Sequence, residues 1–253
     1  MPSPDGAAAP APAPRAWQVV LEHIERDLLG DRLAPGDHLP PERDLAARLG
    51  VGRSSVREAL RVLEVMGLIR TGTGSGPSSG AVIIATPQGG MSALLRLQVA
   101  AHGFPLNDVV RTRVALETAV VEDLAEAADP DTAAVRRILD AMDAAGRSRE
   151  EFLALDAQFH LGLAEASGNL VITATMAGLR SAIESYVRIG AARVADWSKM
   201  ATRLQREHRA ILHAVEAGDP GLARDLVRAH ITGYYADAHL ARESATETER
   251  NRS

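Results

Sequence analysis

The spacing of apolar residues predicts three short helices followed by a β-hairpin in the first third of the chain. Apolar residues recur every three or four positions over residues 16–30, as in an amphipathic helix that a proline-rich stretch then ends. A second helix is expected over Glu42–Leu49, and a third ends at Gly67. The β-prone runs 68–70 and 81–84 flank a glycine-rich turn. This order is typical of a winged helix-turn-helix domain.

The remaining pattern is helical throughout, with short connections that favour an antiparallel bundle. The predicted fold class is therefore mainly α, with an α/β winged domain over 16–85, a linker over 86–90 and an all-α bundle over 91–242. Residues 1–15 are expected to form a disordered leader, and residues 243–253 a disordered tail. The expected helices of the bundle span 91–101, 107–128, 131–145, 149–166, 170–194, 198–217 and 221–242.

Several helix starts carry capping signals. Asp129 and Asp219 each precede a proline, which places an N-cap before a residue whose missing N–H costs nothing in the first turn. Ser148 is followed three residues later by Glu151, as in a capping box. Ser55, near the start of the third helix, is followed by a glutamate at the same spacing and fits a second box, although the first turn of this helix could begin a few residues earlier.

Composition excludes several classes of protein. The absence of cysteine excludes disulfides, thiolate zinc fingers, iron–sulfur clusters and thiol nucleophiles. An aromatic content of 3% argues against domains that stack RNA bases on Phe and Tyr. No apolar run approaches the roughly 18 residues of a membrane helix, and the leader lacks the basic start of a secretory signal. These features predict a cytoplasmic protein without membrane contact.

Basic charge is concentrated around the third helix, although the whole chain has a net charge of −5. The N-terminal end of this helix is the part that a helix-turn-helix presents to the major groove of DNA. Arg53 and Arg57 lie four residues apart and therefore on one helical face. Small side chains at Ser54 and Ser55 permit close approach, and Arg43 can hold the flanking phosphate backbone. The alternative is that these arginines are ordinary surface residues.

One carboxylate and three imidazoles in the second domain could form a metal site. Asp156 and His160 are four residues apart on one predicted helix, and His208 and His230 lie on two later helices. Such a ligand set suits Zn²⁺, Ni²⁺ or Mn²⁺. Spacing alone leaves open that the four are separate surface residues. His213, about 140° around the helix from His208, is expected to face solvent.

Arg113 is a candidate ligand contact on the predicted helix over 107–128. An arginine that faces the interior of a bundle can pair with Glu117 or bind the carboxylate of a ligand in a bidentate fashion. The alternative is an ordinary surface ion pair with Glu117, which lies four residues later.

Two segments resemble known protein families. The segment 35–69, PGDHLPPERDLAARLGVGRSSVREALRVLEVMGLI, resembles the winged helix-turn-helix of GntR-type bacterial transcription regulators. The second domain resembles the helical FCD ligand-binding domain of the FadR-like branch. It carries RVALE at 113–117, DAQFH at 156–160, ASGN at 166–169, EHRAI at 207–211 and AHI at 229–231.

The resemblance implies a homodimer that binds a palindromic operator. It implies DNA contacts by Arg43, Arg53 and Arg57 and by glycines of the wing. It also implies that the Asp and three His hold a divalent metal that helps to bind a small organic acid, whose carboxylate meets Arg113. The chain departs from the family pattern at Gly52, where many relatives have Ser, and in the longer glycine- and serine-rich wing tip.

The sequence therefore predicts a metabolite-responsive transcription regulator that is not an enzyme. An architectural DNA-binding protein with an inert dimerisation bundle is one alternative. A helical metalloenzyme is a less favoured one, because Asp156 would already serve as a metal ligand and no other general base lies near the site in sequence.

Overall fold

The structure is a computed structural model that describes residues 15–72, 80–85, 87–101 and 103–250. The chain divides into two compact units, Met1–Gly90 and Met91–Ser253. The expected leader over 1–14 and the wing tip over 73–79 lie outside the described residues.

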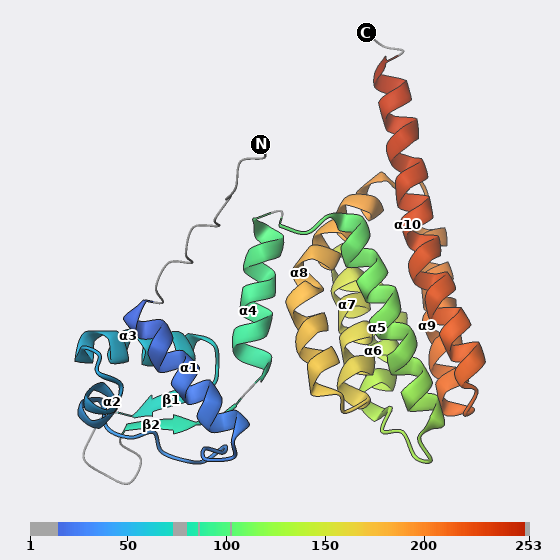
Figure 1. Ribbon diagram of the computed structural model, residues 1–253. Coiled ribbons are helices and arrows are strands. Elements are labelled where there is room, and N and C mark those ends of the chain that lie inside the picture. The colour runs from blue at the N-terminus through green and yellow to red at the C-terminus, as the bar shows by residue number, and fades with distance from the viewer. Residues whose placement is uncertain (1–14, 73–79, 86, 102, 251–253) are drawn as a thin grey trace, which may run out of the picture. The chain divides into compact units, whose positions relative to one another are not determined.

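The N-terminal unit is a winged helix-turn-helix, as the sequence predicts (Figure 1). Strands β1 and β2 pair antiparallel, with Ile69 opposite Ile83. The chain before α2 extends this sheet, since the Leu39 N–H donates to the Ala81 carbonyl at 2.8 Å. The elements of this unit are α1 (Ala16–Leu29), α2 (Glu42–Leu49), α3 (Arg53–Val65), β1 (Ile69–Gly72) and β2 (Gly80–Ile83).

Side chains from each of these elements meet in one hydrophobic core. Because one face of each helix is apolar, packing these faces together buries them and leaves the polar faces in water. The buried side chains include Val20, Ile24, Leu45, Val56, Leu60, Leu63, Ile69 and Ile83.

The turn between α2 and α3 is set by a glycine. Gly50 has a φ of 64°, in the left-handed region that favours glycine, and its N–H donates to the Ala46 carbonyl. Helix α3 then begins at Arg53, with Gly52 as an N-cap that has no side chain to offer. The capping box at Ser55 therefore does not form. The helix begins earlier, which is the alternative that the sequence left open, and Ser55 already lies in its first turn.

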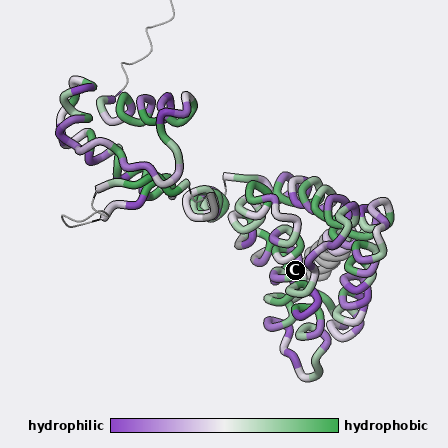
Figure 2. Tube along the Cα trace, turned by 90° about the horizontal axis from the view of Figure 1, so that it is seen from below, coloured by the Kyte–Doolittle hydropathy of each residue, from purple (hydrophilic) through white to green (hydrophobic). Residues whose placement is uncertain are grey.

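The second unit is an all-α bundle, as predicted, and its helices show the alternating hydropathy of amphipathic helices (Figure 2). Helix α5 packs along α10, and α7 packs against both α6 and α8. Its core includes Val121, Leu139, Phe159, Leu163, Ile211 and Ile231. The helices from residue 87 onward are α4 (Pro87–Ala100), α5 (Leu106–Glu126), α6 (Ala133–Asp143), α7 (Arg149–Ala166), α8 (Leu170–Arg193), α9 (Trp197–Glu216) and α10 (Pro220–Arg250).

Two expected caps form and one does not. Ser148 and Glu151 make the reciprocal bonds of a capping box, and Asp219 accepts a hydrogen bond from the Leu222 N–H at 2.9 Å. Asp129 does not cap a helix, because α6 begins later, at Ala133, with Thr132 as its N-cap residue. The Thr132 hydroxyl instead donates to the Glu216 carboxylate of α9 at 2.8 Å, which ties this loop to the bundle.

Two segments expected to be irregular are helical. Helix α4 starts at Pro87, inside the expected linker, and proline fits the first turn of a helix because its missing N–H has no partner there. Helix α10 continues to Arg250, through most of the expected tail over 243–253. No glycine or proline follows Gly233 before that point, and Ala, Glu and Arg favour helix.

Helices α4 and α8 approach closely within the second unit. A Cβ built on Gly178 would lie 2.7 Å from the Leu95 Cβ, so this crossing requires a residue without a side chain. Beside it, the buried Ser92 hydroxyl donates to the Ala174 carbonyl at 2.9 Å.

Candidate functional site

The structure brings the four predicted metal ligands together inside the bundle. Asp156 and His160 come from α7, His208 from α9 and His230 from α10, and one ligand atom from each lies within 4.8 Å of the others. The His230 Nε2 lies 3.1 Å from that of His208 and 3.3 Å from that of His160. The Asp156 carboxylate lies 3.2 Å from the His208 Nε2. All four side chains are buried.

Carboxylates outside the cluster fix the orientation of two of the imidazoles. The His160 Nδ1 lies 2.5 Å from a Glu117 oxygen, and the His230 Nδ1 lies 2.7 Å from a Glu207 oxygen. Because a carboxylate can only accept, each Nδ1 carries the proton and donates a hydrogen bond to the carboxylate oxygen. The Nε2 of each ring is then unprotonated and faces the cluster. Two such lone pairs at 3.3 Å repel each other unless a cation lies between them.

Burial favours the neutral forms of His160 and His230, and neighbouring groups favour the ionised form of Asp156. Burial lowers the pKa of His160 and, together with the neighbouring imidazoles, lowers that of His230 much further. Burial alone would raise the pKa of Asp156, but the hydrogen bond with His208 and the nearby histidines outweigh it and lower the pKa. Three imidazoles and one carboxylate form a donor set that fits a divalent ion of the Zn²⁺, Ni²⁺ or Mn²⁺ type.

Arg113 is connected to this cluster through Glu117. Its Nε donates to Glu117 at 2.6 Å, and Glu117 also accepts from His160. Burial would raise the pKa of Glu117, but Arg113 and His160 more than offset it and lower the pKa to about 2. Arg113 thus forms the interior pair with Glu117, one of the two interior roles that the sequence predicts for it, and not a surface pair.

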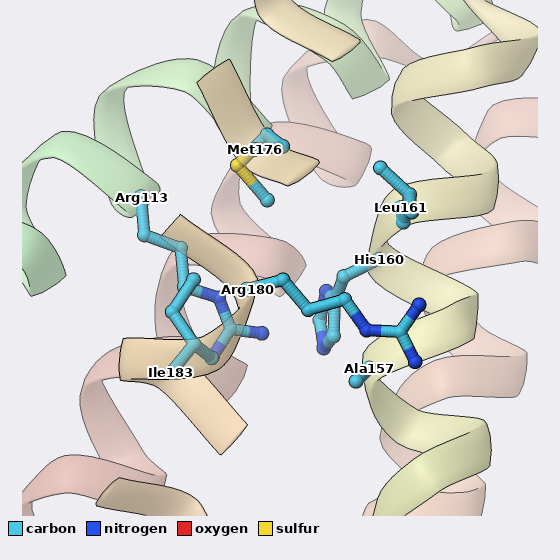
Figure 3. Close-up of a pocket in the computed structure, with 7 residues that line it drawn as sticks. All are labelled: Arg113, Ala157, His160, Leu161, Met176, Arg180 and Ile183. Carbon is cyan, nitrogen blue, oxygen red and sulfur yellow. The ribbon is translucent and has the colours of Figure 1, made fainter. Parts of the chain in front are cut away.

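A small pocket of about 20 Å³ lies beside the cluster (Figure 3). It shares His160 with the cluster, and Arg113, which pairs with Glu117, also lines it. His160 lines the pocket, and Arg113 contributes charge to its wall. The remaining wall is mostly apolar, which is typical of small-molecule sites. The lining residues are Arg113, Ala157, His160, Leu161, Met176, Arg180 and Ile183.

Three features of the site were not predicted from the sequence. These are the bridge that Glu117 forms between Arg113 and His160, the pairing of Glu207 with His230, and the presence of Arg180 in the pocket wall. Glu117 gave a signal, since it lies one helical turn after Arg113. Arg180 gave none, because the chain is rich in arginine and only packing brings α8 beside α7. The control residue His213 is exposed, as predicted.

The predicted DNA-contact residues lie on the surface of the N-terminal unit. Arg43, Arg53, Ser54 and Arg57 are exposed, and Ser55 is half-buried. Their ion pairs are weak surface contacts. Arg57 lies 3.6 Å from the Glu42 carboxylate and Arg43 lies 3.1 Å from that of Asp44. Of the wing glycines that the resemblance implicates in DNA contact, Gly72 ends β1 and Gly80 begins β2, whereas Gly74 and Gly76 lie outside the described residues.

A winged helix-turn-helix unit with exposed arginines at the start of α3 has the architecture of a DNA-binding protein. The chain matches the GntR family of bacterial regulatory proteins over residues 17–77 and the FCD domain family over residues 108–233. The protein belongs to the GntR family and carries an FCD domain, so the predicted resemblance is confirmed.

Relatives of this chain are transcription regulators. A putative L-lactate dehydrogenase operon regulatory protein of Escherichia coli K12 is 30% identical over 203 residues, 79% of this chain and 77% of the relative. The Glc operon transcriptional activator of the same strain is 28% identical, with 88% of each chain covered. A GntR protein of Streptococcus agalactiae shares the fold, with a TM-score of 0.54 at 24% identity over 86% of this chain and 97% of that one.

The protein is therefore a DNA-binding transcription regulator and not an enzyme. Among the described residues, every helix is too short or too polar to cross a lipid bilayer.

Proposed function

We propose that this protein is a cytoplasmic, metabolite-responsive regulator that binds a palindromic operator as a homodimer. Its bundle holds a divalent metal ion that helps to bind a small organic acid, and the bound acid changes the affinity for DNA. The observation that carries the proposal is the convergence of Asp156, His160, His208 and His230 beside a pocket that His160 also lines.

Different residues of the bundle would have different roles in binding an acid. Asp156 and the three histidines would hold the ion, which supplies open coordination positions for carboxylate or hydroxyl oxygens. Arg113 adds positive charge to the pocket wall, and Glu117 fixes both Arg113 and His160 in place. Apolar side chains exclude water and strengthen these electrostatic interactions.

The N-terminal unit supplies the operator contacts in this proposal. The start of α3 would enter the major groove, where it presents Arg53 and Arg57, together with Ser54 and Ser55, which lie between them in sequence. Arg43 would hold the adjacent phosphate backbone of the DNA. Two-fold symmetry of the dimer would place two such helices on two half-sites. The acid can act only if its affinity differs between the DNA-competent and DNA-incompetent states.

Operator binding by the full chain tests the proposal. Operator fragments selected from random duplex DNA are titrated with zinc-loaded protein, with and without short carboxylic acids. L-Lactate is included because one relative is described as a regulator of an L-lactate dehydrogenase operon. We expect at least one acid to change the affinity for DNA, and a chelator to remove that effect.

The exposed His213 provides a matched control, since His213→Ala should respond like the wild type while His208→Ala should not. Protein that binds DNA but no stoichiometric divalent ion would instead favour the architectural alternative with an inert bundle.

A further inference from the structure

A second arginine lines the pocket, and its ion pair is much more exposed to solvent than that of Arg113. Arg180 lies on α8 and extends across the pocket toward Ala157 of α7 (Figure 3). Its Nε donates to Glu184 at 2.6 Å, one turn later on the same helix. Arg180 is therefore a second cationic group at the pocket, beside Arg113.

The two ion pairs differ in what it costs to open them. The side chains of Arg113 and Glu117 are 3% and 2% exposed, so separating them would leave buried charges without partners. The side chains of Arg180 and Glu184 are each 35% exposed, and solvent weakens their attraction. If they separate, Glu184 can turn to water, and Arg180 is then available to a ligand.

The charge balance leaves a role for this second arginine. A divalent ion and Asp156 together leave one positive charge, and the pairs Arg113–Glu117 and Arg180–Glu184 are each neutral. One carboxylate on the ligand therefore neutralises the remaining positive charge of the cluster. A second carboxylate needs a further cation, and Arg180 can supply it by exchanging Glu184 for the ligand.

We propose that the pocket selects a short dicarboxylic acid, with one carboxylate at the metal cluster beside Arg113 and the other paired with Arg180. The apolar side chains of Leu161, Met176 and Ile183 pack against the carbon chain between them. Arg180 is the residue that distinguishes diacids from monoacids. This inference rests on the proposed function and specifies the chemical class of the acid.

Acids matched in chain length provide the test. Malonate, succinate and glutarate are compared with propionate, butyrate and valerate by calorimetric titration of the zinc-loaded full chain at neutral pH. We expect at least one diacid to bind about tenfold to a hundredfold more tightly than its matched monoacid, as a charge-assisted hydrogen bond predicts. Arg180→Gln should remove this preference and leave zinc stoichiometry unchanged.

Two further variants separate recognition from a merely structural role. Glu184→Gln removes the competing carboxylate and should increase diacid affinity, the opposite of Arg180→Gln. Arg188→Gln changes an exposed arginine two turns further along α8, outside the pocket wall, and should have no effect.

The outcomes distinguish the two proposals. Monoacids that bind as tightly as diacids, or a diacid preference that survives Arg180→Gln, would overturn the assignment of Arg180 alone. Failure of every acid to bind the zinc-loaded wild type would overturn the proposed function as well.

Discussion

Metal binding should stabilise the bundle, and removal of His208 should abolish that stabilisation. His208 is fully buried on α9, and its Nε2 lies 3.2 Å from the Asp156 carboxylate and 3.1 Å from the His230 Nε2. The ligands come from three helices, α7, α9 and α10, so an ion at this point binds the folded bundle and not the unfolded chain. His208→Ala removes one of four ligands from the centre of the cluster.

The size of the effect follows from linkage. A ligand present at about a thousand times its dissociation constant stabilises the folded state by about 4 kcal/mol. For a domain of roughly 150–250 residues, 1 kcal/mol shifts the Tm by about 2–4 °C. Zinc should therefore raise the Tm of the bundle transition by about 8–16 °C relative to chelator-treated protein, and His208→Ala should show almost none of this shift.

Differential scanning calorimetry of the full chain, with zinc or with chelator, measures the shift. The quantity compared is the difference between the two conditions, because His208→Ala also removes packing against Phe159, whose ring centroid lies 4.5 Å away. His213→Ala, five residues further along the same helix and exposed, should keep the wild-type shift. A Tm of wild-type protein that does not respond to zinc, nickel or manganese would refute the reasoning.

Three further predictions concern other parts of the chain. Arg57→Ala should weaken specific operator binding by about 1–3 kcal/mol if Arg57 reads a base, and unchanged affinity in gel-shift titrations at fixed salt would contradict that role. Glu117→Gln should lower zinc affinity about 10–100-fold in a chelator competition assay, because the charge that orients an imidazole is lost, and an unaltered affinity would speak against it. Gly178→Ala places a Cβ 2.7 Å from the Leu95 Cβ and should lower the free energy of unfolding by about 1–3 kcal/mol in urea titrations, whereas Gly233→Ala, with open space around it, should not.

Much of the fold could be predicted because local signals agree with the final packing. Apolar periodicity predicted each helix of the bundle, and Ser148 capped α7 through side-chain chemistry that is local in sequence. The predicted helix starts and caps differ from the structure where a tertiary contact or a preceding turn determines where the helix begins. Thr132 binds Glu216 on a distant helix, and Gly50 sets the start of α3 before Ser55 can act as a cap.

The candidate site could be predicted only in part for the same reason. Helical spacing placed Asp156 and His160 on one face, but it could not bring two further helices to that face, and the family resemblance supplied that step. Neither spacing nor resemblance indicated Arg180 or the partnership of Glu207 with His230, because both depend on which helices become neighbours.

The nitrogen and oxygen ligands of the candidate metal site have a consequence for its chemistry under oxidative stress. Thiolate sites lose their ion when peroxide converts cysteine to sulfenic acid, but this chain contains no cysteine, and imidazole and carboxylate resist such attack. The sulfur that lines the pocket is the thioether of Met176, which peroxide can convert to a polar sulfoxide. Mild oxidation would therefore spare the metal ligands and change the neighbouring wall where the acid is proposed to bind.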